Sequence, residues 1–211
     1  MPNDCFQNLT ILLVDDERFS RTTVASMLSG LGRPTVLEAE NGIEALAVLG
    51  EQKVDFIISD FNMPRGHGLQ LLQAVRTGKL SLIKPDTPFA MLTGYSEEKL
   101  VDFALALDVN AFLIKPVSKD GLHKRLSKML NLGQSGRWLK DRNIYESINV
   151  DGILDEIANP NASAAPQSLM PKGLPLQQSS KPTKKNTAVP AKARRPVSGY
   201  RPESGPIKSG A

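Results

Sequence analysis

The chain has 211 residues, with 26 Lys and Arg, 22 Asp and Glu, and a single cysteine, Cys5. One cysteine excludes an intrachain disulfide, and no apolar run approaches the roughly 20 residues that a membrane-spanning helix needs. The N-terminus lacks the basic start and long apolar stretch of a secretory signal. We therefore expect a cytoplasmic protein with no transmembrane segment.

The charge is distributed unevenly along the chain. Residues 1–159 carry 17 basic and 21 acidic residues, a net charge of −4, whereas residues 160–211 carry 9 basic and 1 acidic residue, a net charge of +8. The second segment also contains nine of the 15 prolines and a single aromatic residue, Tyr200. Such a composition cannot bury enough apolar surface to offset the entropy of ordering the chain. We predict that residues 160–211 form a disordered, basic, proline-rich tail.

Residues 8–131 repeat one pattern, in which a short apolar segment is followed by an amphipathic one. The predicted strands are Leu9–Val14, Thr35–Ala39, Val54–Ser59, Pro88–Leu92 and Ala111–Ile114. The predicted helices are Ser20–Leu31, Gly42–Leu49, Leu69–Val75, Glu97–Leu107 and Ser118–Leu130. In the second helix, Ile43, Leu46 and Leu49 are expected to face the core. The alternation predicts an α/β fold with a parallel sheet covered by helices on both faces.

A different pattern follows in residues 132–159. Ile144 with Ile148, and Leu154 with Ile157, are apolar pairs at helical spacing, which predicts one or two short amphipathic helices. An extension that packs on the preceding domain is the favoured interpretation, and a partner-binding helix is the alternative.

Polar residues follow four of the predicted strands. Asp15 and Asp16 come after the first strand, Asp60 after the third, Thr93 after the fourth and Lys115 after the fifth. Ligands of open parallel α/β sheets collect at the carboxyl ends of the strands, so these side chains are expected to share one pocket. Three carboxylates repel one another, and a hard divalent cation such as Mg²⁺ relieves the repulsion. A carboxylate nucleophile, a metal site and two phosphate-holding groups together predict a phosphoryl acceptor.

Each of these residues alone has an ordinary structural explanation. A single Asp after a strand is more often a helix N-cap, and an isolated Lys-Pro or Thr-Gly pair is usually a turn. Together, however, the residues stand at the ends of predicted strands, in an order that suits phosphoryl transfer. Coincidence is therefore the weaker explanation.

Four segments, ILLVDDE, ISDFNMP, MLTGYS and FLIKPVS, resemble the signature blocks of the receiver domain of bacterial two-component response regulators. The resemblance covers about residues 8–131. It implies a doubly wound, flavodoxin-like fold with five parallel strands in the order 2-1-3-4-5. It also implies phosphorelay signalling, in which a sensor histidine kinase or phosphotransfer protein supplies the phosphoryl group. Such a domain signals to a partner by a conformational switch and does not turn over a substrate.

The resemblance further implies which residues accept the phosphoryl group and hold the metal. Asp60 is the phosphoacceptor and also a ligand of Mg²⁺. Asp16 ligates the metal directly, Asp15 mostly through water, and Asn62 through its main-chain carbonyl.

Other residues are implied to hold the phosphoryl group and transmit the signal. Lys115 binds the phosphoryl group, and the Thr93 hydroxyl moves toward it. Phe112 occupies the position at which the family has an aromatic side chain that rotates when the threonine moves. The movements of Thr93 and Phe112 reshape the surface formed by the fourth helix, fifth strand and fifth helix, where an unknown downstream protein binds. The peptide bond before Pro116 is expected to be cis.

The sequence departs from the family pattern in two places. The connection Thr77–Thr87 is longer than the minimal one. DNA-binding regulators usually pair their receivers through acidic residues at the start of the fifth strand, where this chain has Asn110-Ala111. That pairing mode and an ordinary DNA-binding output are therefore not expected.

The sequence leaves two alternative functions open. A haloacid-dehalogenase-like phosphatase also uses Mg²⁺ and an aspartyl phosphate, but its acids stand in an Asp-x-Asp pattern on the first strand, whereas Asp15 and Asp16 are adjacent. A regulator whose basic tail binds nucleic acid or another acidic surface is the other alternative. No nucleic-acid-binding fold follows the receiver in the sequence, so this output is not favoured.

Overall fold

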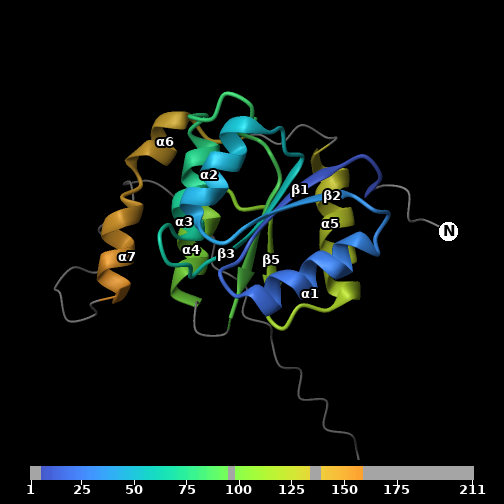
Figure 1. Cartoon of the computed structure of the whole chain (residues 1–211). Coiled ribbons are helices and arrows are strands. Elements are labelled where there is room, and N and C mark those ends of the chain that lie inside the picture. Colours follow the sequence, from blue (N-terminus) through green and yellow to red (C-terminus); the bar gives the residue numbers. More distant parts are fainter. Residues whose placement is uncertain (1–5, 95–97, 134–138, 159–211) are drawn as a thin grey trace, which may run out of the picture. The chain divides into compact units, whose positions relative to one another are not determined.

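A computed structural model describes residues 6–94, 98–133 and 139–158 (Figure 1). Cys5 and the predicted tail, residues 160–211, lie outside this part of the chain. Within it, no helix is both long enough and apolar enough to cross a bilayer.

Five parallel strands form a single sheet at the centre of the fold. They are β1 (Thr10–Val14), β2 (Thr35–Ala39), β3 (Phe56–Asp60), β4 (Phe89–Thr93) and β5 (Ala111–Ile114). Their order is β2-β1-β3-β4-β5, and every neighbouring pair is parallel. The predicted fold class and strand order are confirmed. Asp60 and Thr93, which were expected just beyond their strands, are the last residues of β3 and β4.

Helices cover both faces of the sheet (Figure 1). Helices α1 (Arg18–Ser29) and α5 (Lys119–Gly133) lie on one face, and α2 (Gly42–Glu51), α3 (Gly68–Arg76) and α4 (Glu98–Ala106) lie on the other. Successive strand residues point to opposite faces, so each face has its own apolar core. The side chains of Leu13 and Ile58 belong to the α1–α5 core, whereas those of Leu12 and Ile57 belong to the other.

Helix α2 presents a different face to the core from the one predicted. Its buried residues are Gly42, Ala45 and Leu49, whereas Ile43 is 63% exposed and Leu46 is 37% exposed. A Cβ atom on Gly42 would lie 2.7 Å from the carbonyl oxygen of Gly66, so only glycine allows this close approach. Gly42 and Ala45 therefore face inward together with Leu49, so the prediction was right for Leu49 and wrong for Ile43 and Leu46.

Two further helices follow α5, namely α6 (Arg142–Ser147) and α7 (Val150–Ala158). Both contact α3, and Figure 1 shows them outside the α2–α3–α4 layer. Tyr145, Ile148, Val150 and Ile153 are at most 2% exposed and extend the core on that side of the sheet. In the described part of this segment, residues 139–158, the two helices pack on α3 and on this core.

The long connection between α3 and β4 is held by a buried cation. Arg76, at the end of α3, is 1% exposed. Its guanidinium donates to the main-chain oxygens of Pro85, Thr87 and Asp108, at 2.6, 2.9 and 3.1 Å, and to Oδ1 of Asn110 at 2.8 Å. The same Asn110 oxygen accepts the amide N–H of the first residue of β4, at 2.9 Å. The α3–β4 connection and the α4–β5 turn are thus fixed to each other.

Candidate functional site

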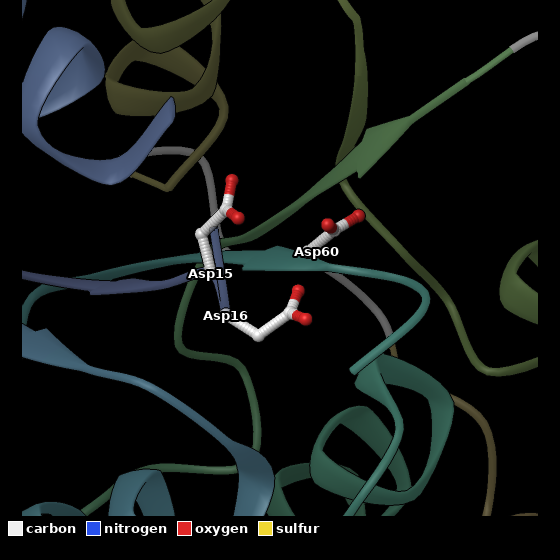
Figure 2. Close-up of side chains that lie close together, drawn as sticks. All are labelled: Asp15, Asp16 and Asp60. Atoms are coloured by element: carbon white, nitrogen blue, oxygen red, sulfur yellow. The ribbon is translucent and has the colours of Figure 1, made fainter. Parts of the chain in front are cut away.

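Three carboxylates meet at the carboxyl ends of β1 and β3. The register pairs Val14 with Ser59, which brings Asp15 and Asp16 beside Asp60 (Figure 2). One carboxylate oxygen from each of the three residues lies within 4.8 Å of the other two. Asp15 and Asp60 are buried, and Asp16 is exposed. The convergence predicted from the strand ends is therefore present in the structure.

Lys115 lies between two of these carboxylates. Its Nζ is 2.5 Å from Oδ2 of Asp60 and 3.1 Å from Oδ2 of Asp15. The main-chain N–H of Lys115 donates to the Thr93 oxygen at 2.9 Å, which places the lysine directly after β5. Burial lowers the pKa of Lys115, but hydrogen bonds and attraction to Asp60 and Asp15 raise it further, so the net pKa lies above the ordinary value. Lys115 is therefore a cation, and the peptide bond that joins it to Pro116 is cis, as expected.

The Asp15 carboxylate is held on several sides. Oδ1 accepts the main-chain N–H of Glu17 at 3.0 Å, and Oδ2 accepts the Ser20 hydroxyl at 2.7 Å in addition to Lys115. Ser20 lies in the first turn of α1, which begins directly after the two acids. Asp15 is thus fixed by protein donors, which suits a ligand that contacts a metal through water.

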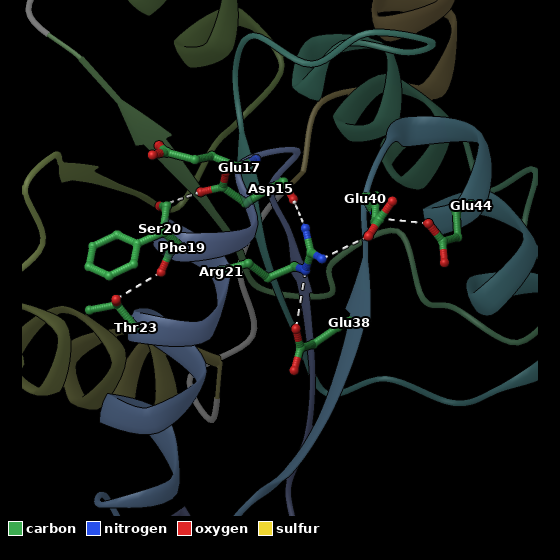
Figure 3. A network of polar contacts seen from close by, with 9 residues as sticks. All are labelled: Asp15, Glu17, Phe19, Ser20, Arg21, Thr23, Glu38, Glu40 and Glu44. Atoms are coloured by element: carbon green, nitrogen blue, oxygen red, sulfur yellow. Dashed lines mark hydrogen bonds and ion pairs between the residues drawn. The ribbon is translucent and has the colours of Figure 1, made fainter.

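Arg21 fixes the main chain at the same turn (Figure 3). Its Nη1 donates to the Asp15 carbonyl oxygen at 2.6 Å. Nε and Nη2 pair with Glu38 at 3.1 Å and Glu40 at 2.9 Å, at the carboxyl end of β2. Neither Ser20 nor Arg21 was singled out from the sequence. Arg21 shares the buried face of α1 with Val24 and Leu28, and a cation within an apolar stripe is a signal that could have identified it.

The other predicted site residues lie around the carboxylates. Thr93 is 7% exposed, and its hydroxyl donates to the Gly94 oxygen at 3.1 Å. Asn62 is exposed in the loop after β3. Phe112 is half-buried on β5 and stacks on Phe61, with the ring centroids 6.3 Å apart. The Phe61 N–H in turn donates to Oδ1 of Asp60 at 2.7 Å, so Phe61 connects Phe112 to the Asp60 carboxylate.

An open hollow of about 400 Å³ adjoins the site. It lies between the start of α1 and the β5–α5 connection, and its lining includes Lys115, Pro116 and Phe19. The Phe19 ring is 78% exposed, which is unusual for so large an apolar side chain. A macromolecule that approached Asp60 and Lys115 through this hollow would contact Phe19.

The donor set defines what the site can hold. Carboxylate oxygens are the ligands that Mg²⁺ prefers, and it is commonly held by one or two of them with water or phosphate completing the shell. Asp16 and Asp60 present such oxygens, while the Lys115 ammonium and the Thr93 hydroxyl can donate to a phosphate. The arrangement fits a magnesium ion and a phosphoryl group side by side.

Comparison with known sequences identifies the family to which the domain belongs. The sequence profile of the response regulator receiver domain matches residues 11–127, more than half of the chain. The chain belongs to the response regulator receiver family. Receiver domains are signalling modules of two-component systems that interact with histidine kinases or phosphotransfer proteins and with downstream targets.

Individual relatives support this assignment. A chemotaxis protein CheY homolog of Campylobacter jejuni is 35% identical over 126 residues, which cover 59% of this chain and 95% of the relative. Chemotaxis protein CheY-3 of Vibrio cholerae is 31% identical over 123 residues, 58% of this chain and 92% of the relative.

Solved structures give the same result. The chemotaxis response regulator CheY4 of Vibrio cholerae has a TM-score of 0.52 and 32% identity, covering 58% of this chain and 99% of that one. The receiver domain of a sensor histidine kinase from Pseudomonas aeruginosa, solved with a magnesium ion in its active-site cleft, has a TM-score of 0.52 and 25% identity. It covers 59% of this chain and 98% of that one. Each of these four relatives is matched over 58–59% of this chain.

Proposed function

We propose that this protein is a cytoplasmic response regulator that is phosphorylated on Asp60 and signals through a conformational switch. The observation that supports this most directly is the convergence of Asp15, Asp16 and Asp60 beside Lys115 at one edge of a receiver fold. A phosphatase of the haloacid-dehalogenase class gains no support from the fold or the relatives.

The phosphodonor is a phosphohistidine on a sensor histidine kinase or phosphotransfer protein. A carboxylate oxygen of Asp60 attacks the phosphorus, a new P–O bond forms, and the P–N bond breaks. The histidine leaves with the electron pair of that bond and takes up a proton. The products are an aspartyl phosphate and a neutral imidazole. Lys115, which is paired with Asp60 in the resting state, then pairs with a phosphoryl oxygen.

A magnesium ion would be held by Asp16, Asp60 and the main-chain carbonyl of Asn62, with Asp15 acting mostly through water. When bound, it would neutralise charge on the phosphoryl oxygens during transfer. The magnesium found in the related Pseudomonas aeruginosa receiver supports this assignment.

The output follows from the added charge. A phosphoryl group brings about −1.5 to −2 charges to a pocket where Thr93 and Lys115 can approach it. Movement of Thr93 would leave space into which Phe112 can shift, because the register pairs Met91 with Phe112 and so places Thr93 and Phe112 on the same face of neighbouring strands. The face formed by α4, β5 and α5 would change shape, and a downstream protein would bind there.

The acceptor assignment can be tested by chemical phosphorylation. Incubation of the full chain with acetyl phosphate and Mg²⁺ should add one phosphoryl group by intact mass, and hydroxylamine should remove it. Asp60→Asn should abolish the label, whereas Asp86→Asn, at an exposed loop position, should retain it. A full label on the Asp60→Asn variant would refute the assignment.

The donor's approach can be tested separately. Phe19 is exposed beside the hollow, so Phe19→Ser should slow transfer from a phosphorylated histidine protein by removing an apolar contact. Labelling by acetyl phosphate should stay unchanged, because that small donor needs no such contact. Equal slowing with both donors would contradict a docking role for Phe19.

A further inference from the structure

The extension formed by α6 and α7 is attached to the receiver by polar contacts as well as by its apolar side. The polar contacts fall at two places, the α4–β5 turn and helix α3. The start of α3 lies against Asp60, and the α4–β5 turn leads into β5, which carries Phe112.

The first attachment is at Asp108, in the turn between α4 and β5. The Tyr145 hydroxyl donates to Oδ2 of Asp108 at 2.7 Å, and Lys140 Nζ pairs with Oδ1 at 3.0 Å. Lys140 Nζ also donates to the Ala106 oxygen at 2.9 Å, at the end of α4. Tyr145 is 1% exposed, whereas the Asp108 side chain is 17% exposed, so the contact is partly shielded from water. The extension therefore fixes the end of the helix that leads from Thr93 to β5.

The second attachment is on α3. Gln70 Nε2 donates to Oδ1 of Asp151 on α7 at 2.6 Å, and Gln70 Oε1 accepts the His67 N–H at 2.9 Å. Gln73 Nε2 donates to the main-chain oxygens of Tyr145 and Ile148, at 2.7 and 2.8 Å.

The Gln70 contact leads back to the phosphoacceptor. The N–H of Gly68, the residue after His67, donates to the Phe61 oxygen at 3.1 Å. The Phe61 N–H donates to Oδ1 of Asp60 at 2.7 Å. A Cβ atom on Gly68 would lie 2.3 Å from the Asp60 oxygen, so the start of α3 sits directly against the acceptor residue. Helix α7 is thus joined through α3 to the loop that carries Asp60.

We propose that residues 139–158 act as an intramolecular clamp that stabilises the unphosphorylated arrangement and is weakened when Asp60 is phosphorylated. This inference rests on the proposed function. The hydrogen bonds from the extension to Asp108 and to Gln70 depend on the present positions of the α4–β5 turn and the start of α3. A shift of about 1 Å in either position would lengthen such a bond beyond hydrogen-bonding distance. Movement of either place toward a phosphoryl group therefore loosens the clamp.

Thermodynamic linkage makes the inference reciprocal. If phosphorylation weakens the clamp, then weakening the clamp must favour the phosphorylated arrangement by the same factor. Breaking one attachment should therefore increase affinity for a phosphoryl analogue. Couplings between sites commonly amount to about 5–150-fold in affinity, so a change of about fivefold is expected from each attachment.

Beryllofluoride with Mg²⁺ is the phosphoryl analogue for the test, used on the full chain. Tyr145→Phe removes the donor to Asp108, and Asp151→Ala removes the exposed acceptor of Gln70 without altering the core. Asp155→Ala, at an exposed position on the same helix, is the matched control. Calorimetry should show about fivefold tighter beryllofluoride binding for the first two variants and wild-type affinity for the control. Hydrogen exchange of residues 139–158 should become faster when the wild type binds beryllofluoride.

The outcomes separate this inference from the proposed function. If the wild type neither binds beryllofluoride nor becomes labelled on Asp60, the proposed function fails and the clamp inference fails with it. If it does both but exchange in residues 139–158 and affinity in the two variants stay unchanged, only the clamp inference is overturned. Weaker binding by both variants would also overturn it, because the extension would then favour the phosphorylated arrangement.

Discussion

Lys115 should make a large contribution to the stability of the metal-free protein, and Lys115→Met tests this. The substitution keeps much of the side-chain length but removes the cation that lies 2.5 Å from Asp60 and 3.1 Å from Asp15. Three carboxylates would then face one another without an internal counter-charge. We expect the free energy of unfolding without metal to fall.

The size of the effect follows from the geometry. Two unit charges 3.1 Å apart attract by roughly 5 kcal/mol at an effective dielectric constant of about 20. The cost of desolvating the charges offsets part of this attraction, and removing one member of a buried pair usually costs about 3–5 kcal/mol. The Lys115 side chain is 26% exposed, so solvent screening places the expected loss near the lower end, at about 3 kcal/mol. For a protein of this size, that loss corresponds to a decrease in Tm of roughly 6–12 °C.

Thermal unfolding in EDTA and in excess Mg²⁺ provides the assay, with Lys124→Met at an exposed position of α5 as the control. In EDTA, Lys115→Met should unfold well below the wild type and the control. Mg²⁺ should raise its Tm by more than it raises that of the wild type, because the metal replaces the missing positive charge. Equal Tm values for the two lysine variants in EDTA would refute the reasoning. An equal gain from Mg²⁺ in wild type and Lys115→Met would show that the lysine and the metal do not serve the same carboxylates.

Four further results are expected. Asp16→Ala should weaken Mg²⁺ binding in calorimetry and raise the Tm of the metal-free protein, because it removes both a ligand and a repelling charge. Arg76→Met should lower the unfolding free energy in urea by about 3 kcal/mol or more, since buried carbonyls lose their donor. Burial and the hydrogen bond to Asp108 raise the pKa of Tyr145 above its ordinary value, so the stability it provides is present below about pH 10 and lost at higher pH. Unfolding curves above pH 10 should therefore show a steeper loss for the wild type than for Tyr145→Phe. Deletion of residues 160–211, the predicted tail, should leave the Tm and the acetyl phosphate label nearly unchanged.

Much of the fold could be predicted because the strands of a parallel sheet are buried on both faces. Segments such as Ile11–Val14 and Phe56–Ile58 are then continuous apolar runs, and the acids that follow them mark the strand ends. The same logic placed Asp15, Asp60, Thr93 and Lys115 at one edge, where the structure has them. Their assigned roles in phosphorylation remain predictions.

The parts that were missed depend on close contact between distant residues. Helix α2 has two apolar stripes, and the prediction chose the one with the larger side chains, Ile43 and Leu46. The sequence near the helix does not show that Gly42 lies against Gly66, which is what turns the other stripe toward the core. The partners of Asp15 on α1, Ser20 and Arg21, were overlooked because polar residues at the start of a helix have many ordinary explanations. The attachment of Tyr145 to Asp108 joins residues 37 positions apart, which helical spacing cannot reveal.

Asn110 has a consequence for how this chain could evolve. Its side-chain oxygen is already used inside the fold, where it accepts from Arg76 and from the first amide of β4. Replacement by Asp would introduce an acidic residue of the kind used in the receiver pairing of DNA-binding regulators, and it would keep the same acceptor oxygen. The new charge would pair with the buried guanidinium and would not be offered to a neighbouring molecule. Receiver pairing of that kind would therefore need a change at Arg76 as well as at Asn110, so a single substitution would not produce it.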